Sequence, residues 1–236
     1  MSQQKASSEN VDIVLVHGAW GDGSGWAKVI APLVADGFSV TAAPLPLTSL
    51  ADDVAALERA LERVTGAVIL VGHAYAGAVI ASVASEKVKA LVYIAALAPD
   101  EGETVADVFY RGEPHPQAPK LAPDSHGLIY LPHDAFADAY AQNAGEEDLA
   151  VLAAAQRPIS PACITVPLAR PLWKDRPSWF LIAEEDRMIS AANQHFMAER
   201  MGAKQRSLLV DHTPMTTAPQ SVVELIREAV AAAISV

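Results

Sequence analysis

The side chains with the clearest chemistry in this chain are a carboxylate and an imidazole, Asp186 and His212. Each follows a short apolar run, SWFLIA in the first case and RSLLV in the second. An imidazole acts as a general base when a carboxylate orients its second ring nitrogen. Both residues come after the motif GHAYAG (residues 72–77), whose small residues are typical of a tight turn between a strand and a helix. The order turn, acid, histidine is that of one class of serine-based catalytic triads.

The central position of this turn holds Ala74, where a nucleophilic serine is expected. Alanine preserves the turn but removes the only oxygen that could attack a carbonyl there. The backbone N–H of the next residue, Tyr75, is still available to stabilise an oxyanion. The alternative is that this junction serves only close packing, and the hexapeptide alone leaves the two interpretations evenly balanced.

Three other acids are rivals for the role of Asp186. Glu184 and Glu185 precede it directly, and Asp211 adjoins the histidine. Asp211 is less suited because successive side chains diverge. His212 could be an ordinary loop histidine, but its position after a predicted strand favours the catalytic interpretation.

The elements that must position these residues follow from an alternation of apolar runs and helical patterns. The predicted strands span residues 11–16, 38–42, 68–71, 89–95, 178–183 and 206–210. The predicted helices span residues 24–36, 49–65, 78–84, 190–201 and 219–234. This order predicts an α/β fold with a doubly wound, mainly parallel sheet of about six strands. Functional groups in such sheets gather beyond the carboxyl ends of the strands.

Residues 99–176 interrupt the alternation. Ten of the 16 prolines lie here, a density incompatible with a continuous strand or helix. Short helices are expected only at about 134–143 and 146–156. The aromatic content favours a packed, substrate-facing lid over a disordered segment. We therefore predict an α/β core from residues 11–98 and 177–236, an inserted helical cap at 99–176, and a disordered arm at 1–10.

Four motifs in this sequence resemble those of the α/β-hydrolase superfamily. They are VLVHGAW (residues 14–20), GHAYAG (72–77), AEEDR (183–187) and DHTPM (211–215). Over essentially its whole length the chain is similar to the small, lidded branch that includes plant methyl esterases, hydroxynitrile lyases and many bacterial esterases. The superfamily also holds members whose turn lacks serine, and cofactor-independent oxygenases that rely on a His/Asp pair.

This resemblance implies a role for each matching residue. It places Ala74 at the nucleophile position, Asp186 at the acid position and His212 at the position of the general base. It also assigns the oxyanion hole to the backbone N–H groups of Ala19 and Tyr75. The implied activity is hydrolysis of an ester-like bond by a Ser/His/Asp-type mechanism.

Large side chains near these motifs and in the lid are candidates for substrate binding. The candidates are Trp20, Trp26, Phe109, Tyr130, Trp173 and Met215. Such a lining favours a small, mostly apolar molecule with an ester, lactone, amide or activated carbonyl.

Composition excludes several other classes of function. A net charge of −11 argues against nucleic acid and anionic membrane surfaces as partners. No apolar run is long enough to span a membrane, and the polar N-terminus lacks the core of a signal peptide. One cysteine, Cys163, rules out an internal disulfide and suits a reducing cytoplasm.

The remaining histidines do not point to a metal. His115, His126 and His133 have a spacing unlike that of common zinc sites. His17 and His73 are expected to support the shape of their loops. We therefore expect neither a metal nor a cofactor.

Three interpretations of Ala74 stay open at this stage. The chain could be an esterase-like hydrolase that has lost its serine, by engineering or naturally. It could be a serine-free enzyme in which the His212/Asp186 pair is a general base for water activation, lyase or cofactor-independent oxygenase chemistry. It could also be a binding protein without turnover. The retained acid and base favour the first two.

Overall fold

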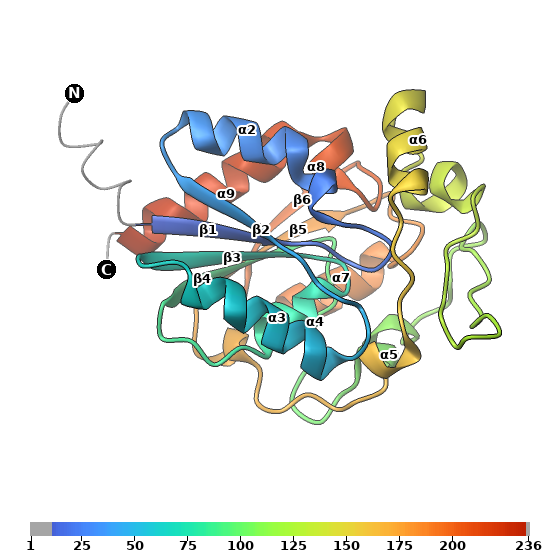
Figure 1. Cartoon of the computed structure of the whole chain (residues 1–236), viewed down its shortest axis with the longest axis horizontal. Coiled ribbons are helices and arrows are strands. Elements are labelled where there is room, and N and C mark those ends of the chain that lie inside the picture. Colours follow the sequence, from blue (N-terminus) through green and yellow to red (C-terminus); the bar gives the residue numbers. More distant parts are fainter. Residues whose placement is uncertain (1–10, 235–236) are drawn as a thin grey trace.

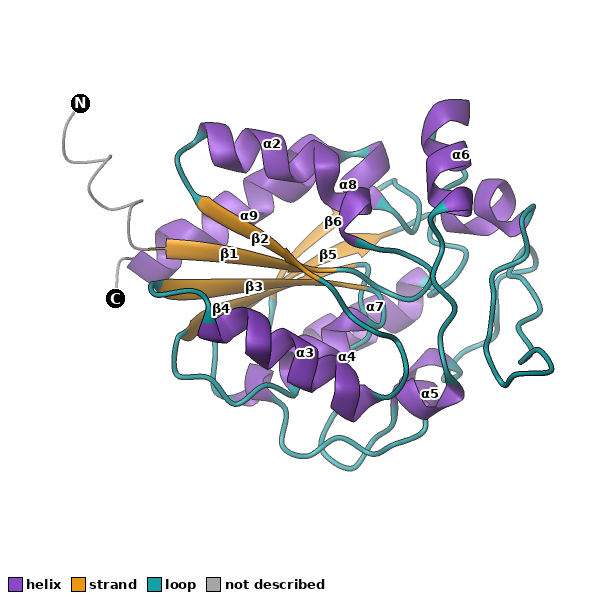
Figure 2. Ribbon diagram, in the orientation of Figure 1, coloured by secondary structure: helices purple, strands orange, loops and turns teal. Residues whose placement is uncertain are grey.

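The structure is a computed structural model that describes residues 11–234, so the predicted arm at residues 1–10 lies outside the described residues. All six strands of the sheet run parallel, in the order β2-β1-β3-β4-β5-β6 (Figures 1 and 2). Their bounds are β1 Val11–Val16, β2 Ser39–Ala43, β3 Ala67–His73, β4 Val88–Ile94, β5 Ser178–Ala183 and β6 Lys204–Leu208. The predicted fold class is confirmed.

Helices cover both faces of the sheet. Figure 1 shows α2 (Ala27–Ala35) and α9 (Pro219–Ile234) on one face, and α3 (Leu50–Glu62) and α4 (Ala76–Ala81) on the other. The second face also receives α7 (Ala191–Arg200). The central strand β3 is buried on both faces: Ile69 and Val71 pack on one side, Val68 and Leu70 on the other. This is why its apolar residues are continuous rather than alternating.

Local sequence signals account for several helix boundaries. Ser49 caps α3 by accepting a hydrogen bond from the N–H of Asp52 at 3.1 Å, as predicted. The helix predicted at 24–36 instead begins with a 3₁₀ turn, η1 (Gly23–Trp26), before α2. β6 begins and ends two residues before the predicted strand, because an edge strand tolerates polar residues such as Lys204 and Gln205.

The segment between β4 and β5 is mostly irregular. It holds two short α-helices, α5 (Val105–Phe109) and α6 (Glu146–Ala154). It also holds a π-helical turn, η2 (Phe136–Tyr140), and the 3₁₀ turns η3 (Pro161–Cys163) and η4 (Leu172–Lys174). α5 was not expected from the sequence, although Thr104 and Asp107 form a full capping box at its start.

Figure 1 places much of this segment, including α5 and α6, beyond the carboxyl ends of the strands. A short α8 (Pro214–Thr217) follows β6 and leads into α9. No helix in the part of the chain from residue 11 to 234 is both long and apolar enough to cross a bilayer.

Candidate active site

The turn between β3 and α4 holds Ala74 in a left-handed backbone conformation, with φ of 49°. This conformation is unfavourable for a residue with a Cβ, so the surroundings must enforce it. The Ala74 N–H donates to the carbonyl of Ile94 at 3.3 Å, and its carbonyl accepts from the N–H groups of Gly77 at 3.1 Å and Leu97 at 2.9 Å. The β4 end therefore fixes the turn.

Glycines make this turn sterically possible. A Cβ at Gly72 would lie 2.9 Å from the carbonyl oxygen of Ala76, inside the elbow of the turn. A Cβ at Gly18 would lie 2.9 Å from the Cβ of Ala74. The glycine after β1 therefore lets the first loop lie directly against the apex.

The structure brings Asp186 and His212 together. The Nδ1 atom of His212 lies 2.8 Å from Oδ2 of Asp186, and both side chains are buried. The carboxylate also accepts from the N–H groups of Met188 at 2.7 Å and Ile189 at 2.9 Å, and from Nε2 of Gln194 at 2.8 Å. Because the Asp186 carboxylate acts as the acceptor in all of these contacts, the proton of the His212 imidazole lies on Nδ1. Nε2 of His212 has no hydrogen-bond partner among the described residues.

The rival acids are engaged elsewhere. Glu184 accepts from His195 at 2.9 Å, and Glu185 faces the side-chain amide of Asn143 at 3.4 Å. Asp211 accepts hydrogen bonds from the N–H of Asn143 at 2.9 Å and from the N–H of Thr213 at 3.1 Å. Asp186 is the acid that faces the imidazole.

Two further histidines hold loops in place by hydrogen bonds to the backbone. Nε2 of His73 donates to the backbone carbonyl of His212 at 2.7 Å, and burial together with the nearby His212 holds the pKa of His73 well below its usual range. Nε2 of His17 accepts from the N–H of Leu45 at 3.0 Å, while Nδ1 donates to the carbonyl of Gly18 at 2.9 Å. Burial also lowers the pKa of His17. The lowered pKa values favour the neutral rings, whose hydrogen bonds hold the surrounding loops.

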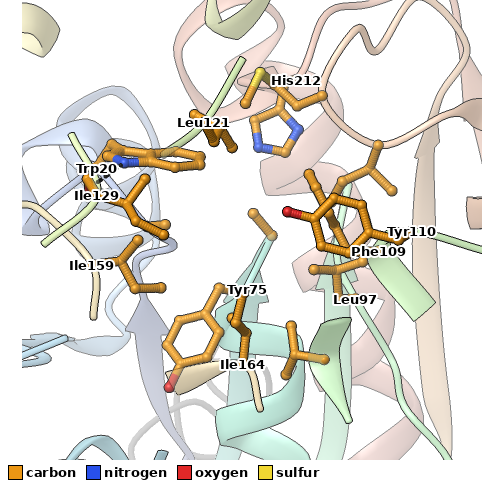
Figure 3. Close-up of a pocket in the computed structure, with 15 residues that line it drawn as sticks. Trp20, Tyr75, Leu97, Phe109, Tyr110, Leu121, Ile129, Ile159, Ile164 and His212 are labelled. Atoms are coloured by element: carbon orange, nitrogen blue, oxygen red, sulfur yellow. Dashed lines mark hydrogen bonds between the residues drawn. The ribbon is translucent and has the colours of Figure 1, made fainter. Parts of the chain in front are cut away.

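A mostly apolar cavity joins Ala74 and His212 (Figure 3). Its lining from the α/β core is Ala19, Trp20, Ala74, Tyr75, Leu97, Met188, Ile189 and His212. Its lining from the segment 99–176 is Val105, Phe109, Tyr110, Leu121, Ile129, Ile159 and Ile164. Nearly half of the lining residues therefore come from the segment between β4 and β5.

The backbone N–H groups of Ala19 and Tyr75 belong to residues that line this cavity. Neither N–H donates a hydrogen bond to any residue of the described chain. Trp20, which follows Ala19, has a positive φ of 59°, a second strained position beside the site. The carbonyl of Ala19 accepts from the hydroxyl of Tyr140 at 3.2 Å, which steadies this loop.

Of the side chains expected to bind substrate, Trp20 and Phe109 line the cavity. The other four do not line this cavity. Trp26 and Met215 pack in the core on the opposite face of the sheet. Trp173 donates to the carbonyl of Pro99 at 3.2 Å, and Tyr130 is 48% exposed outside the lining.

Sequence reasoning missed most of the lining. Met188 and Ile189 lie two and three residues after the acid, so their position in the chain was an available signal. The aliphatic residues Leu121, Ile129 and Ile159 lie in irregular backbone and carry no pattern. Within residues 11–234 no cluster of three or more histidine, cysteine, aspartate or glutamate side chains is placed to hold a metal ion.

Comparison with known proteins places the fold in a family. Residues 13–225 match the model of the alpha/beta hydrolase family. The chain belongs to that family. No curated protein matches this α/β-hydrolase by sequence.

Several solved structures are similar to this α/β-hydrolase in fold. A pyrethroid hydrolase from Sphingobium faniae JZ-2 has a TM-score of 0.83 at 23% identity, covering 94% of this chain and 98% of that one. Polyneuridine aldehyde esterase has a TM-score of 0.76 at 20% identity, covering 93% and 98%. A histidine-to-alanine variant of tomato methylketone synthase I, complexed with β-ketoheptanoate, has a TM-score of 0.80 at 19% identity, covering 95% and 99%.

Proposed function

We propose that this α/β-hydrolase acts on a small, mostly apolar acyl compound by proton transfer through His212, without a covalent intermediate. The observation that carries the proposal is the buried contact of 2.8 Å between His212 and Asp186, beside a cavity that Ala74 also lines. Ala74 has no atom that could form an acyl bond. The imidazole of His212 is therefore the reactive side chain beside the turn.

The proposed reaction is hydrolysis of an ester-like bond by water. A water molecule in the space that a serine hydroxyl would occupy gives its proton to Nε2 of His212 as its oxygen attacks the carbonyl carbon. The N–H groups of Ala19 and Tyr75 hold the resulting oxyanion. Asp186 stabilises the imidazolium, which then gives the proton to the departing oxygen. The products are an acid and an alcohol.

The esterase and hydrolase names of similar structures support this chemistry at the level of the family. The partner that we propose is a small molecule, because the cavity is apolar and the chain carries a net charge of −11. Polyanions such as nucleic acid are repelled by this charge.

The Ala74→Ser substitution tests the assignment of the turn. We expect the serine form to hydrolyse p-nitrophenyl butanoate with a burst of p-nitrophenolate, and to exceed the native chain by orders of magnitude. The reason is that loss of one triad member commonly leaves only roughly 10³–10⁴-fold acceleration over water. Stopped-flow absorbance measures the burst.

The control is the double variant Ala74→Ser/His212→Ala, which should lose the gain. A serine form as inactive as the native chain would contradict the proposed arrangement of base and oxyanion donors. In the native chain, turnover that survives His212→Ala would reject proton transfer by this residue.

A second candidate is loss of CO₂ from a β-keto acid. It is favoured by the absence of a side-chain oxygen on Ala74 and by the similar structure that holds β-ketoheptanoate. The C–C bond to the carboxylate breaks and releases CO₂, and its electrons form an enolate held by the Ala19 and Tyr75 N–H groups. A proton taken from water by the enolate carbon completes the methyl ketone. We expect heptane-2,4-dione not to react and 3-oxoheptanoate to give hexan-2-one and CO₂, measured by gas chromatography. Formation no faster than in buffer would reject this candidate.

A further inference from the structure

We propose that the Tyr110 hydroxyl is a second polar contact for the substrate, opposite the catalytic histidine. The ligand is then an acyl compound with an apolar body and a second oxygen that accepts a hydrogen bond. This inference rests on the proposed function, because it takes the first oxygen to lie at the turn.

Hydrogen bonding within the protein accounts for most polar groups of the cavity wall. Nε1 of Trp20 donates to the carbonyl of Ile129 at 3.0 Å, and the Tyr75 hydroxyl donates to Oδ2 of Asp53 at 2.7 Å. Nδ1 of His212 is committed to its carboxylate. Two side-chain groups of the lining keep free hydrogen-bonding capacity within the described chain: Nε2 of His212 and the hydroxyl of Tyr110.

The two tyrosines of the lining point in opposite directions. Figure 3 shows the hydroxyl of Tyr110 directed toward the middle of the cavity, whereas the hydroxyl of Tyr75 is directed away from it. The His212 ring faces the same central space. A ligand that meets the imidazole therefore has the Tyr110 hydroxyl at its side.

Local structure holds Tyr110 in this place. Its N–H donates to the carbonyl of Ala106 at 2.9 Å, which continues the last turn of α5. The ring meets Phe109 edge to face, with centroids 4.9 Å apart and an interplanar angle of 87°. A side-chain amide, that of Asn193, donates to the carbonyl of Val108 and ties α5 to α7.

Tyr110 also marks the boundary of the apolar space. Its side chain borders a second, outer cavity whose wall includes Glu113, His115 and Lys120. The residue is 65% exposed, so its ring lies at the mouth. A ligand that reaches the turn from this side passes the hydroxyl. A second oxygen there finds a side-chain donor, while the N–H groups of Ala19 and Tyr75 remain for the first oxygen at the turn.

Two stable probes of equal chain length separate this hydrogen bond from apolar contact. Heptan-2-one carries one carbonyl oxygen, and heptane-2,4-dione carries two. We expect Tyr110→Phe to weaken binding of the dione by roughly 2- to 10-fold, the range of one net hydrogen bond, and to leave the ketone unchanged. Isothermal titration calorimetry with the full native chain measures both dissociation constants.

The matched control is Tyr130→Phe, another half-exposed tyrosine of the same segment that does not line the cavity. It should change neither constant. An equal effect of Tyr110→Phe on both probes, no effect on either, or binding of neither probe would each overturn the inference.

The titrations, taken together with the turnover of His212→Ala, separate this inference from the proposed function. If turnover survives His212→Ala while the dione effect of Tyr110→Phe is present, proton transfer by His212 fails and the Tyr110 contact stands. If His212→Ala abolishes turnover and the dione effect is absent, the Tyr110 contact alone fails.

Discussion

Asp53 on α3 is a carboxylate with no exposed surface, and its hydrogen-bond donors are all neutral. It accepts from the N–H of Leu47 at 2.7 Å and the hydroxyl of Tyr75 at 2.7 Å, with Sγ of Cys163 at 3.6 Å. Burial raises the pKa of Asp53, although these three contacts oppose the rise. Burial also raises the pKa of the Cys163 thiol to about 12, so that group stays protonated. Asp53 links α3, the turn at Ala74 and the segment 99–176.

The raised pKa of Asp53 predicts the sign of its pH effect. Its contribution to stability is complete below the pKa of the unfolded chain and is lost as pH rises through the folded value. We expect the native chain to gain stability relative to Asp53→Asn as pH falls from 7 toward 4.5. Urea unfolding at several pH values measures the difference in the free energy of unfolding.

The neighbouring Asp52 provides the control for this prediction. Hydrogen bonds from Ser49 and Thr48 lower the pKa of Asp52, so its contribution is present above the unfolded pKa and is lost only at lower pH. The difference between the native chain and Asp52→Asn should therefore stay flat between pH 7 and 4.5. A flat response for Asp53→Asn as well would contradict a buried, perturbed carboxyl at that position.

At the scale of elements, the sequence predicts the strands, the helices and their order, because apolar periodicity is visible along the chain. The strands follow from apolar runs, except that β6 begins in polar residues, and β5 has the predicted bounds. Parallel strands end at one edge of the sheet, and the sequence predicts Asp186 and His212 at two of these ends. The structure places them in contact beyond β5 and β6, which are neighbours in the sheet.

The sequence does not show on which face of the sheet a side chain packs, or whether it lines the cavity. Trp26 is as apolar as Trp20, but it precedes α2 and packs on the opposite face of the sheet. α5 has only five residues, too few for helical periodicity, although Thr104 begins a capping box. The aliphatic wall comes from irregular backbone, where tertiary contacts rather than local pattern decide position.

At the scale of the molecule, the segment 99–176 shares one hydrophobic core with the sheet. Buried side chains of the segment pack in the same cluster as residues of β3, α3 and α4. These side chains include Leu131, Phe136, Tyr140, Ile159, Cys163 and Leu168. Hydrogen bonds add to this contact: the N–H of Ser160 donates to the carbonyl of Leu47 at 2.9 Å, and Asn143 N–H donates to Asp211. The cavity therefore lies between two parts of the chain that share one hydrophobic core.

A shared core predicts a single cooperative unfolding transition. Trp173 reports from the segment and Trp179 from β5. In a chain whose Trp20 and Trp26 are both replaced by Phe, Trp173→Phe and Trp179→Phe each leave one tryptophan as a regional probe. We expect fluorescence of both variants and far-UV circular dichroism to give coincident midpoints in urea, after correction for any change in overall stability. Separate unfolding of the segment would give an earlier fluorescence transition in Trp179→Phe than in circular dichroism of the same variant. That outcome would make the segment an independent lid, and the walls of the cavity would then separate before the sheet unfolds.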